Sequence, residues 1–427
     1  MNVPRLEKEI GIEVYATKTL GINGRLRQLP EDFMVEEVLE NGSVAKIEPP
    51  NIANITGYGR HLICVLVKCK IDTFQAVQTV ADKLDISTER IQIGGIKDAN
   101  AVTAQHVSIS RMLPEQATQI KTSNLWLYPL QFSNEKIHSG MLFGNQFHIT
   151  VRAVNHPKST ITERLESTKR ELLRLGGCPN FFGHQRFGTI RAITHTVGKH
   201  MLFGEWEEAA LAFLAKPSPY EHPESKQARQ RLLDAQNYKE ALSYFPPKLV
   251  YERQMIRHLA KQHRDFVGAF HRLPKKLCQL FINAYQSYLF NRFLSQRIQD
   301  NMQLKKPLKE DYKLTLNNEN YLALPLIGYK LAPSTGKQGE IEKRILEEES
   351  VEPQNFRVSS MPQISSKGGL RIVLTQLIDF NIEKPAKNDH KPRTKIIRLN
   401  FMLRKGSYAT IVLREFMKPR NPAKAGY

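Results

Sequence analysis

The chain has 427 residues and carries 62 Lys and Arg against 42 Asp and Glu, a formal net charge of +20. That length exceeds the needs of one small core and predicts two or three domains. Hydrophobic residues make up 41% of the chain, which argues against wholesale disorder. No uncharged apolar run approaches the roughly 18 residues of a membrane span, so we expect neither a membrane segment nor a signal peptide.

The four cysteines, Cys64, Cys69, Cys178 and Cys278, argue against a metal centre or a disulfide framework. No pair has the C-x-x-C spacing of a structural zinc site, and no His cluster lies near one. We therefore expect a reduced, cytoplasmic protein whose cysteines pack as small hydrophobes.

The excess of positive charge favours a nucleic-acid partner, because a basic surface attracts phosphate backbones through counterion release. Residues 388–427 hold ten Lys and Arg against two acids, a net of +8. Composition alone also allows a solvated basic tail at this position.

The first part of the chain predicts mixed strands and helices. Residues 31–39 alternate with the period of two that is typical of a strand, and Asp72 or Thr73 can cap a helix whose apolar residues recur at helical spacing. In chain order, we predict strands at 31–39 and 61–68, a helix from 73, a strand–loop–strand over 90–110, strands at 125–132 and 145–154, and a helix over 160–177.

The middle of the chain has a different pattern. Residues 196–299 read as nearly continuous helix, and residues 300–370 are polar and less regular. In the longest predicted helix, 278–299, the apolar face is marked by Leu280, Ala284, Tyr288 and Phe293. A mixed α/β region is thus interrupted by a helical block.

The end of the chain returns to strand and helix. A strand at 394–403, a Gly-Ser turn and a helix at 408–418 follow one another, and the polar segment 383–395 before them predicts a linker or exposed loop. Only about the last dozen residues are expected to form a tail.

Residues 94–105, Gly-Gly-Ile-Lys-Asp-Ala-Asn-Ala-Val-Thr-Ala-Gln, form the densest local signal. Glycines at a strand end allow close approach of a ligand, and Lys97 and Asp98 then follow in a loop, where catalytic residues concentrate. The phosphate-binding pattern G-x-x-x-x-G-K-[ST] is absent. Taken alone, this pattern is most often a capped turn.

Two further stretches combine glycine with aromatic or basic residues. Residues 177–188 place Phe181, Phe182 and Arg186 among polar residues, which suits base stacking and phosphate contact but also a buried aromatic turn. Residues 401–415 end a strand in a basic turn that starts a helix, an arrangement that binds anions readily but is also an ordinary strand–turn–helix.

These three stretches, in this order, resemble the TruD family of tRNA pseudouridine synthases. Further matches are Pro-Glu-Asp-Phe-Met-Val-Glu-Glu at 30–37, Gly-Asn-Gln-Phe-His-Ile at 144–149 and the helix at 284–293. The N-terminal extension and the long insertion look archaeal. The resemblance implies an α+β pseudouridine synthase fold with a mixed, largely antiparallel sheet, in a catalytic domain of residues 1–205 and 375–427. It also implies a helix-rich insertion domain at 206–374 and a positively charged cleft between the two.

The resemblance implies that Asp98 is the one essential carboxylate, acting as a nucleophile or as a base at the sugar. No cofactor and no metal is expected, because the isomerisation is redox-neutral. A cation near Asp98 would favour its ionised form, and the two candidates are Lys97 and Arg27, which stands where the family commonly has Lys.

Other positions that match the family motifs receive expected roles. Phe182 is expected to stack on the flipped target base, with Asn180 shaping the pocket. Phe33, Glu37 and Gln105 are expected to line or brace the site, although Phe33 fits core packing equally well. Arg186, Arg404 and Lys405 are expected to contact phosphates.

The substrate implied by the resemblance is tRNA, at uridine 13 in the D arm, and we expect the chain to act as a monomer. Three alternatives remain open. They are a non-catalytic RNA-binding protein or tRNA chaperone on the same fold, a helix-rich scaffold whose charge only aids solubility, and a synthase with a different RNA target.

Overall fold

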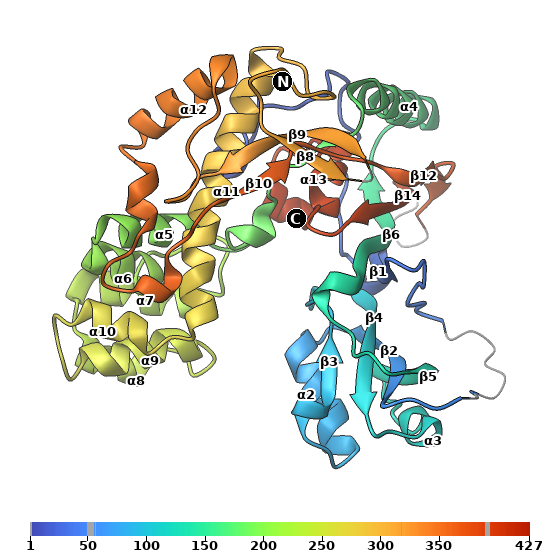
Figure 1. Ribbon diagram of the computed structural model, residues 1–427, viewed down its shortest axis with the longest axis horizontal. Coiled ribbons are helices and arrows are strands. Elements are labelled where there is room, and N and C mark those ends of the chain that lie inside the picture. Colours follow the sequence, from blue (N-terminus) through green and yellow to red (C-terminus); the bar gives the residue numbers. More distant parts are fainter. Residues whose placement is uncertain (1, 49–54, 56, 317, 389–392) are drawn as a thin grey trace.

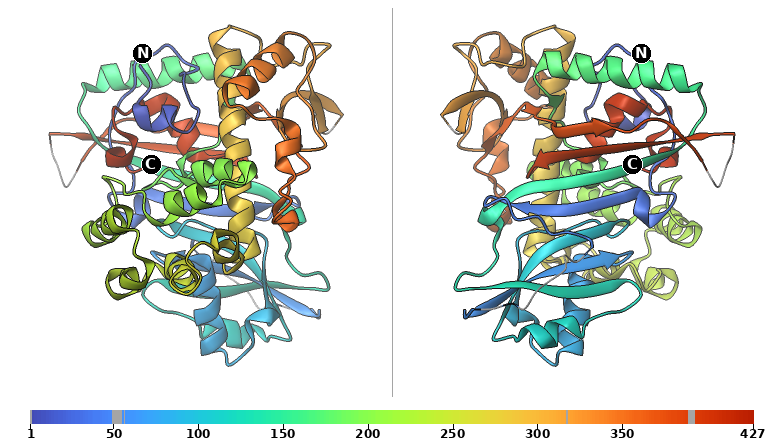
Figure 2. Two further views of the ribbon diagram at one scale, coloured as in Figure 1. Left: turned by 90° about the vertical axis from the view of Figure 1, so that its left-hand side faces the viewer. Right: turned by 90° about the vertical axis from the view of Figure 1, so that its right-hand side faces the viewer.

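The computed structural model describes residues 2–48, 55, 57–316, 318–388 and 393–427. Its centre is a mixed sheet in the order β12-β14-β6-β1-β4-β2-β5, with β13 paired to β14 and β3 paired to β4. Figure 2 shows these strands stacked one below another, with α4 lying across one end. Among the described residues only β1 and β4 pair in parallel, so the mixed, largely antiparallel sheet is confirmed.

Most sheet strands lie close to the positions that the sequence predicts, but β12 and β13 have no predicted counterpart, and β13 lies inside the predicted linker at 383–395. The bounds of the sheet strands are β1 Phe33–Leu39, β2 His61–Cys69, β3 Ile91–Ile93, β4 Val102–Ser110, β5 Leu125–Ser133, β6 Leu142–Val154, β12 Ile378–Ile382, β13 Ala386–Lys387 and β14 Lys395–Arg404. The middle of the predicted linker at 383–395, residues 389–392, lies outside the described residues.

Helices cover the sheet and form a separate lobe. Their bounds are α1 Arg5–Lys8, α2 Thr73–Lys83, α3 Pro114–Thr118, α4 Lys158–Leu175, α5 Thr194–Phe203, α6 Trp206–Leu214, α7 Pro223–Ala235, α8 Tyr238–Tyr244, α9 Val250–Leu259, α10 Phe266–His271, α11 Lys275–Gln299, α12 Gly336–Glu348, α13 Ala409–Met417 and α14 Pro422–Ala425. In Figure 1 the helices α5–α10 gather around one end of α11, while α2 and α3 lie with β2–β5 in a second lobe. A small apolar core of its own holds α2 and α3 against β2, β4 and β5.

The segment 300–370 contains more regular structure than its polar composition predicts. Strands β8 (Lys313–Leu316), β9 (Glu319–Leu326) and β10 (Gly369–Ile372) form a second sheet, and α12 packs against α11. The segment is less regular than the helical block before it, as expected, but short strands and α12 give it more order than its composition suggests. Its apolar residues are few but well placed, because Ile341, Ile345 and Leu346 of α12 are all buried.

Helix α11 differs from its predicted amphipathic pattern. Leu280, assigned to the apolar face, is among the exposed hydrophobic residues, whereas Tyr285, Phe290 and Leu294 are fully buried. The reason is that α11 is covered on several sides, by α5, α12 and β9. A helix surrounded in this way does not show a single apolar stripe.

The last residues do not form a tail. Lys418 and Tyr427 are buried, and the backbone N–H of Leu26 donates to the carbonyl oxygen of Ala425 at 2.8 Å. A short strand pair, β7 (Cys178–Pro179) with β11 (Leu374–Thr375), also joins distant parts of the chain. The basic ending therefore packs against the segment around Leu26, near the start of the chain.

Arg414 joins the first residues of the chain to α13, near its end. Its side chain is 1% exposed and bonds to Glu7 at 2.8 Å, to Glu415 at 2.7 Å and to the carbonyl oxygen of Val14 at 2.8 Å. Glu415 also accepts a 2.8 Å hydrogen bond from the hydroxyl of Thr17. Each buried charge in this cluster has a partner, as burial requires.

Replacing Arg414 by Met tests this cluster. The substitution leaves two carboxylates buried without their cation, so we expect the free energy of unfolding to fall by about 3–5 kcal/mol in urea titrations. The control is Arg5→Met, because Arg5 pairs with Glu9 on the surface, at 91% and 43% exposure. That change should cost less than about 1 kcal/mol. Equal losses in the two variants would contradict the cluster's role.

Candidate active site

The parallel pairing of β1 with β4 brings the predicted site residues together. Met34 lies opposite Val102, so the segments that precede both strands meet at one edge of the pair. Arg27 and Phe33 come from the first segment and Asp98 from the second. The carboxylate of Asp98 lies 3.3 Å from Nη2 of Arg27, and its side chain is 47% exposed.

Arg27 is held so that one end of its guanidinium reaches Asp98. Its backbone is in the left-handed region, with φ of 52°, and its Nη1 donates to the carbonyl oxygen of Gly426 at 2.7 Å. The guanidinium lies 4.1 Å from the centre of the Phe33 ring. Burial lowers the pKa of Arg27, and the charge and hydrogen bond of Asp98 act against that shift. Of the two candidate cations, Arg27 is the one that contacts Asp98.

Lys97 points to a different partner. Its Nζ lies 2.6 Å from Oε2 of Glu37, which is fully buried and also accepts a hydrogen bond from the backbone N–H of His106 at 3.0 Å. Burial acts to raise the pKa of Glu37, but the interaction with the His106 imidazole, whose Nδ1 lies 3.4 Å from Oε1, and the charge of Lys97 outweigh it and hold the pKa below its usual value. Gln105 donates to the carbonyl oxygen of Gly95 at 3.1 Å, which braces the loop from below.

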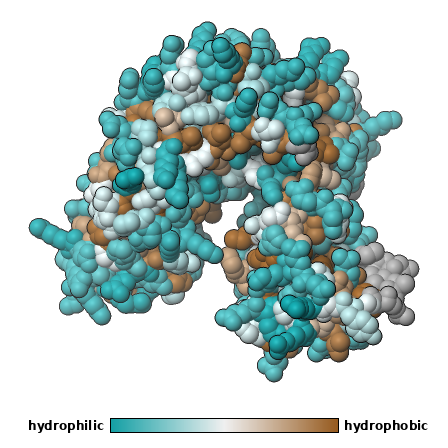
Figure 3. Space-filling view, viewed as in Figure 1, coloured by the Kyte–Doolittle hydropathy of each residue, from teal (hydrophilic) through white to brown (hydrophobic). Residues whose placement is uncertain are grey.

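Asp98 stands where two cavities adjoin. The smaller cavity, about 210 Å³, is lined by Phe33, Val35, Ile96, Lys97, Asp98, Asn145, Phe147, Gln185, Ser407, Tyr408, Ala409 and Thr410. The larger, about 910 Å³, is a groove with residues 26–30 and 98–100 on one side and residues 188–191 and 221–225 on the other. Figure 3 shows an open cleft between the lobe of α5–α10 and the lobe of α2 and α3.

The small cavity contains residues that the sequence analysis did not single out. Asn145, Gln185, Tyr408 and Thr410 all line it, and the hydroxyl of Thr410 lies 3.2 Å from the amide oxygen of Gln185. Each belongs to a stretch that resembles the TruD family, so the stretch was identified but the individual residue was not. Which side chain of a stretch enters a cavity depends on the fold around it.

Phe182 lies behind Tyr408, which lines the small cavity together with Asp98. It is 5% exposed, and its ring lies 6.1 Å from the ring of Tyr408 and 3.9 Å from the guanidinium of Arg371. Arg371 also bonds to the side-chain oxygen of Asn180 at 2.8 Å. Arg186 lies 5.5 Å from the Phe182 ring. The structure therefore brings Phe182, Asn180 and Arg186 together in one cluster, around an arginine that sequence reasoning missed.

Arg404 and Lys405 lie in the turn that precedes α13. Arg404 lies 4.7 Å from the ring of Phe143, and Lys405 is exposed, with Nζ 3.5 Å from the carbonyl oxygen of Gly140. Neither residue is among those that line the two cavities. They are surface cations near the site and make no contact with Asp98 among the described residues.

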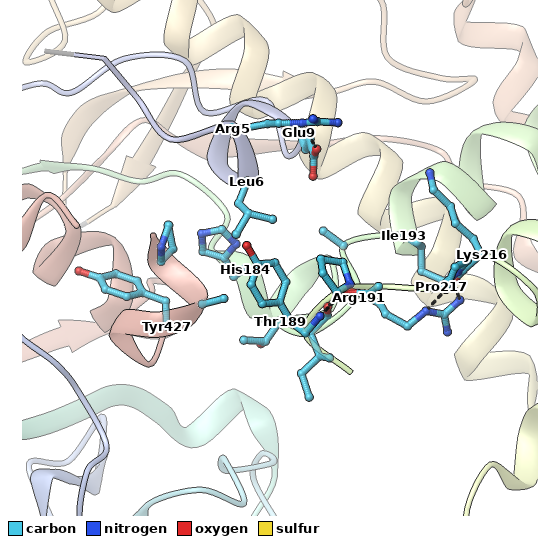
Figure 4. A pocket seen from close by; sticks show the side chains of 17 residues that line it. Arg5, Leu6, Glu9, His184, Thr189, Arg191, Ile193, Lys216, Pro217 and Tyr427 are labelled. Atoms are coloured by element: carbon cyan, nitrogen blue, oxygen red, sulfur yellow. Dashed lines mark hydrogen bonds and ion pairs between the residues drawn. The ribbon is translucent and has the colours of Figure 1, made fainter. Parts of the chain in front are cut away.

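A third cavity, of about 440 Å³, continues the groove on the helical side. Figure 4 shows Arg5, the first residue of α1, and Glu9, which follows that helix, above the cavity, and His184, Thr189 and Arg191 along it. Burial, and to a lesser extent the charge of Arg414, lowers the pKa of His184 to about 4, so its imidazole is neutral at neutral pH. The loop 189–191 separates this cavity from the groove that contains Asp98.

Within the described part of the chain, no three His, Cys, Asp or Glu side chains are grouped as metal ligands would be. The same residues include no helix that is both long and apolar enough to cross a bilayer.

Comparison with known proteins identifies the family. A family model for tRNA pseudouridine synthase D (TruD) matches residues 9–323 and 312–416. A Methanosarcina acetivorans protein named "Probable tRNA pseudouridine synthase D" is 38% identical over 98% of both chains. One of the same name from Methanopyrus kandleri is 37% identical over 84% of this chain and 86% of its own. A crystal structure described as a TruD from Methanosarcina mazei superposes with a TM-score of 0.81 at 36% identity, over 98% of this chain and 99% of that one.

The chain belongs to the TruD family of tRNA pseudouridine synthases. TruD proteins are isomerases, and these relatives are archaeal, as the resemblance in the sequence indicates. The likeness to the solved TruD structure covers nearly the whole chain, so it confirms the α+β fold as well as the family.

Replacing Arg27 by Lys tests the contact with Asp98 in this TruD protein. An ammonium keeps the charge but lacks the planar fork that reaches Gly426 and Asp98 at once. We expect the rate constant of pseudouridine formation at saturating enzyme to fall by about ten- to a hundredfold, the scale of a misplaced reactive group. The matched control is Arg25→Lys, an exposed arginine two residues away, which should keep the rate. A rate within twofold of the unmodified chain for Arg27→Lys would show that the fork is dispensable.

Proposed function

We propose that the chain isomerises uridine to pseudouridine in tRNA, at uridine 13 of the D arm, and that Asp98 is the essential carboxylate. The observation that carries this proposal is the placement of Asp98. Its side chain is 47% exposed at the meeting point of two cavities, with one cation at 3.3 Å. Glu37, the other acid of the loop network, is fully buried against Lys97 and cannot meet a substrate without breaking that pair.

The reaction requires the glycosidic bond to break, the base to turn, and C5 of the base to join the sugar. An exposed carboxylate can act at the sugar, either as a nucleophile or as a base. The small cavity beside Asp98 offers flat rings from Phe147 and Tyr408 and polar groups from Asn145 and Gln185. Such a mixed lining suits a nucleobase taken out of its stack, which must be held while it turns.

Phe182 is proposed to support the target base. Its ring is edge-on to Tyr408, and Arg371 lies over its face, so a base reaches Phe182 directly only where Arg371 moves aside. Asn180 anchors Arg371 in its present place through its side-chain oxygen. With Arg371 in place, Phe182 does not contact the base itself. It supports the base by packing against Tyr408.

RNA is proposed to lie along the groove between the two lobes. The net charge of +20 attracts phosphates, and Arg186, Arg404 and Lys405 are proposed phosphate contacts at its margin. We propose that residues 1–205 and 375–427 form the catalytic domain and residues 206–374 the insertion domain, with α5 packed on α11 at their junction. The active form is proposed to be a cytoplasmic monomer.

Asp98→Asn tests the proposal most directly. The amide keeps the size of the side chain but removes the charge, so pseudouridine formation should be abolished while tRNA binding changes by no more than a few-fold. The matched control is Asp85→Asn, an exposed residue with φ of 51°, a conformation that Asn tolerates well.

The readout for both variants is pseudouridine mapping of total RNA from cells that carry only that variant. Signal at uridine 13 that is lost in Asp98→Asn and kept in Asp85→Asn supports the proposal. Full modification in Asp98→Asn would refute the role of Asp98, and a signal at another RNA position would correct the substrate.

Phe182→Leu tests the aromatic support of the base. Leucine keeps most of the buried apolar volume but removes the ring that packs against Tyr408, so turnover should fall by about tenfold, roughly 1.4 kcal/mol and of the order of one aromatic pair. Thermal unfolding should shift little. Phe74→Leu, at an exposed phenylalanine of α2, is the control. Unchanged turnover in Phe182→Leu would remove Phe182 from the site.

A further inference from the structure

Lys68 is a buried lysine directly beneath the loop that carries Asp98. It lies near the end of β2, between Thr103 of β4 and Leu125 of β5, and is 0% exposed. Charged side chains are rarely buried without paired partners. The family resemblance and the proposed mechanism give Lys68 no role.

The ammonium of Lys68 donates its three hydrogen bonds to backbone carbonyl oxygens. Its Nζ donates to the carbonyl oxygen of Asp98 at 2.7 Å, to that of Ile71 at 2.9 Å and to that of Lys97 at 3.4 Å. Three acceptors match the three N–H donors of an ammonium. Two of these carbonyls belong to the peptide groups on either side of the Asp98 α-carbon, so Lys68 fixes the direction in which that side chain leaves the backbone.

Two further side chains hold the same loop. The hydroxyl of Thr73 accepts from the backbone N–H of Lys97 at 3.0 Å and lies 3.2 Å from the carbonyl oxygen of Lys97, while Gln105 holds the carbonyl oxygen of Gly95. Neither of them carries a charge, and neither contacts Asp98. Lys68 is therefore the member of this group that both contacts the Asp98 backbone and brings a positive charge beneath it.

We propose that Lys68 is a positioning residue that fixes the backbone of Asp98 and so presents its carboxylate to the target nucleotide. The inference rests on the proposed function, in which Asp98 is the essential carboxylate. Removing the ammonium leaves the carbonyl of Asp98 without its donor and the carbonyl of Lys97 with the hydroxyl of Thr73 alone, and it lets the loop take other conformations. The chemical step is affected, whereas RNA binding along the groove is not.

The charge of Lys68 is sensitive to pH in the alkaline range. Burial lowers the pKa of Lys68 to about 8; the nearby Asp98 and Asp72 raise it, Lys97 lowers it and Cys69 raises it slightly. Below pH 8 the group is an ammonium with three donors, and above it the group becomes an amine with two donors and no charge. The positioning role therefore weakens as the pH rises through about 8.

The test compares Lys68→Met with the matched control Lys83→Met, an exposed lysine at the end of α2. The single-turnover rate at saturating enzyme should fall at least tenfold in Lys68→Met and stay within twofold in Lys83→Met. The Kd for tRNA should stay within threefold in both variants. Hydrogen exchange of residues 94–101 should be faster in Lys68→Met alone, and this measurement needs no activity.

The pH dependence separates positioning from a merely structural role. In the unmodified chain the single-turnover rate should fall on an alkaline limb with an apparent pKa near 8, and this limb should be missing from the residual activity of Lys68→Met. A purely structural loss would lower the rate at every pH and keep the limb. If Lys68→Met does not fold, the pH profile of the unmodified chain alone tests the inference. A single-turnover rate that stays level up to pH 9.5 in the unmodified chain would overturn it.

A rate within twofold of normal in Lys68→Met, or unchanged exchange of residues 94–101, would also overturn it. Failure of the proposed function looks different. In that case the unmodified chain forms no pseudouridine in tRNA, while the exchange experiment still reports whether Lys68 holds the loop.

Discussion

The parallel pairing of β1 with β4 is the constraint on which the site depends. In a sheet whose other pairs are antiparallel, this one pair makes two strands start at the same edge. The segments before them then meet, although Arg27 and Asp98 are 71 positions apart in the chain. An antiparallel pairing of the same two strands would place the start of one beside the end of the other and separate these residues.

The ends of the chain complete the site that this pairing begins. The carbonyl oxygen of Gly426 holds one side of the Arg27 guanidinium, so the last residues help to aim the cation at Asp98. Those residues are kept in place by the packing of α13 and by the buried Arg414, which binds Glu7 near the other end of the chain. The interior of the helical lobe does not touch Asp98; that lobe contributes one wall of the groove.

Much of this architecture could be predicted from sequence, and the failures have physical causes. Strand alternation and capping residues located β1, β2, α2 and α4, because these signals are local. Residues 300–370 are expected to be less regular, because their polar composition hides the short buried runs in β9 and α12. The ending was taken for a tail because positive charge dominates its composition. Its burial depends on Leu26 and Arg27, some 400 residues earlier, and no local pattern reports such a contact.

In the motif Lys97-Asp98, the lysine next to Asp98 in sequence is not the cation that contacts its carboxylate. Neighbouring residues in an extended segment point to opposite sides, so Lys97 turns inward to Glu37 while Asp98 faces the cavities. Three cations surround the loop, and each holds a different kind of group. Arg27 binds the carboxylate, Lys97 binds a buried acid, and Lys68 binds the backbone. An exposed carboxylate on a loop held from three sides suits the role proposed for Asp98, because a reactive group must stay in place while the base turns beside it.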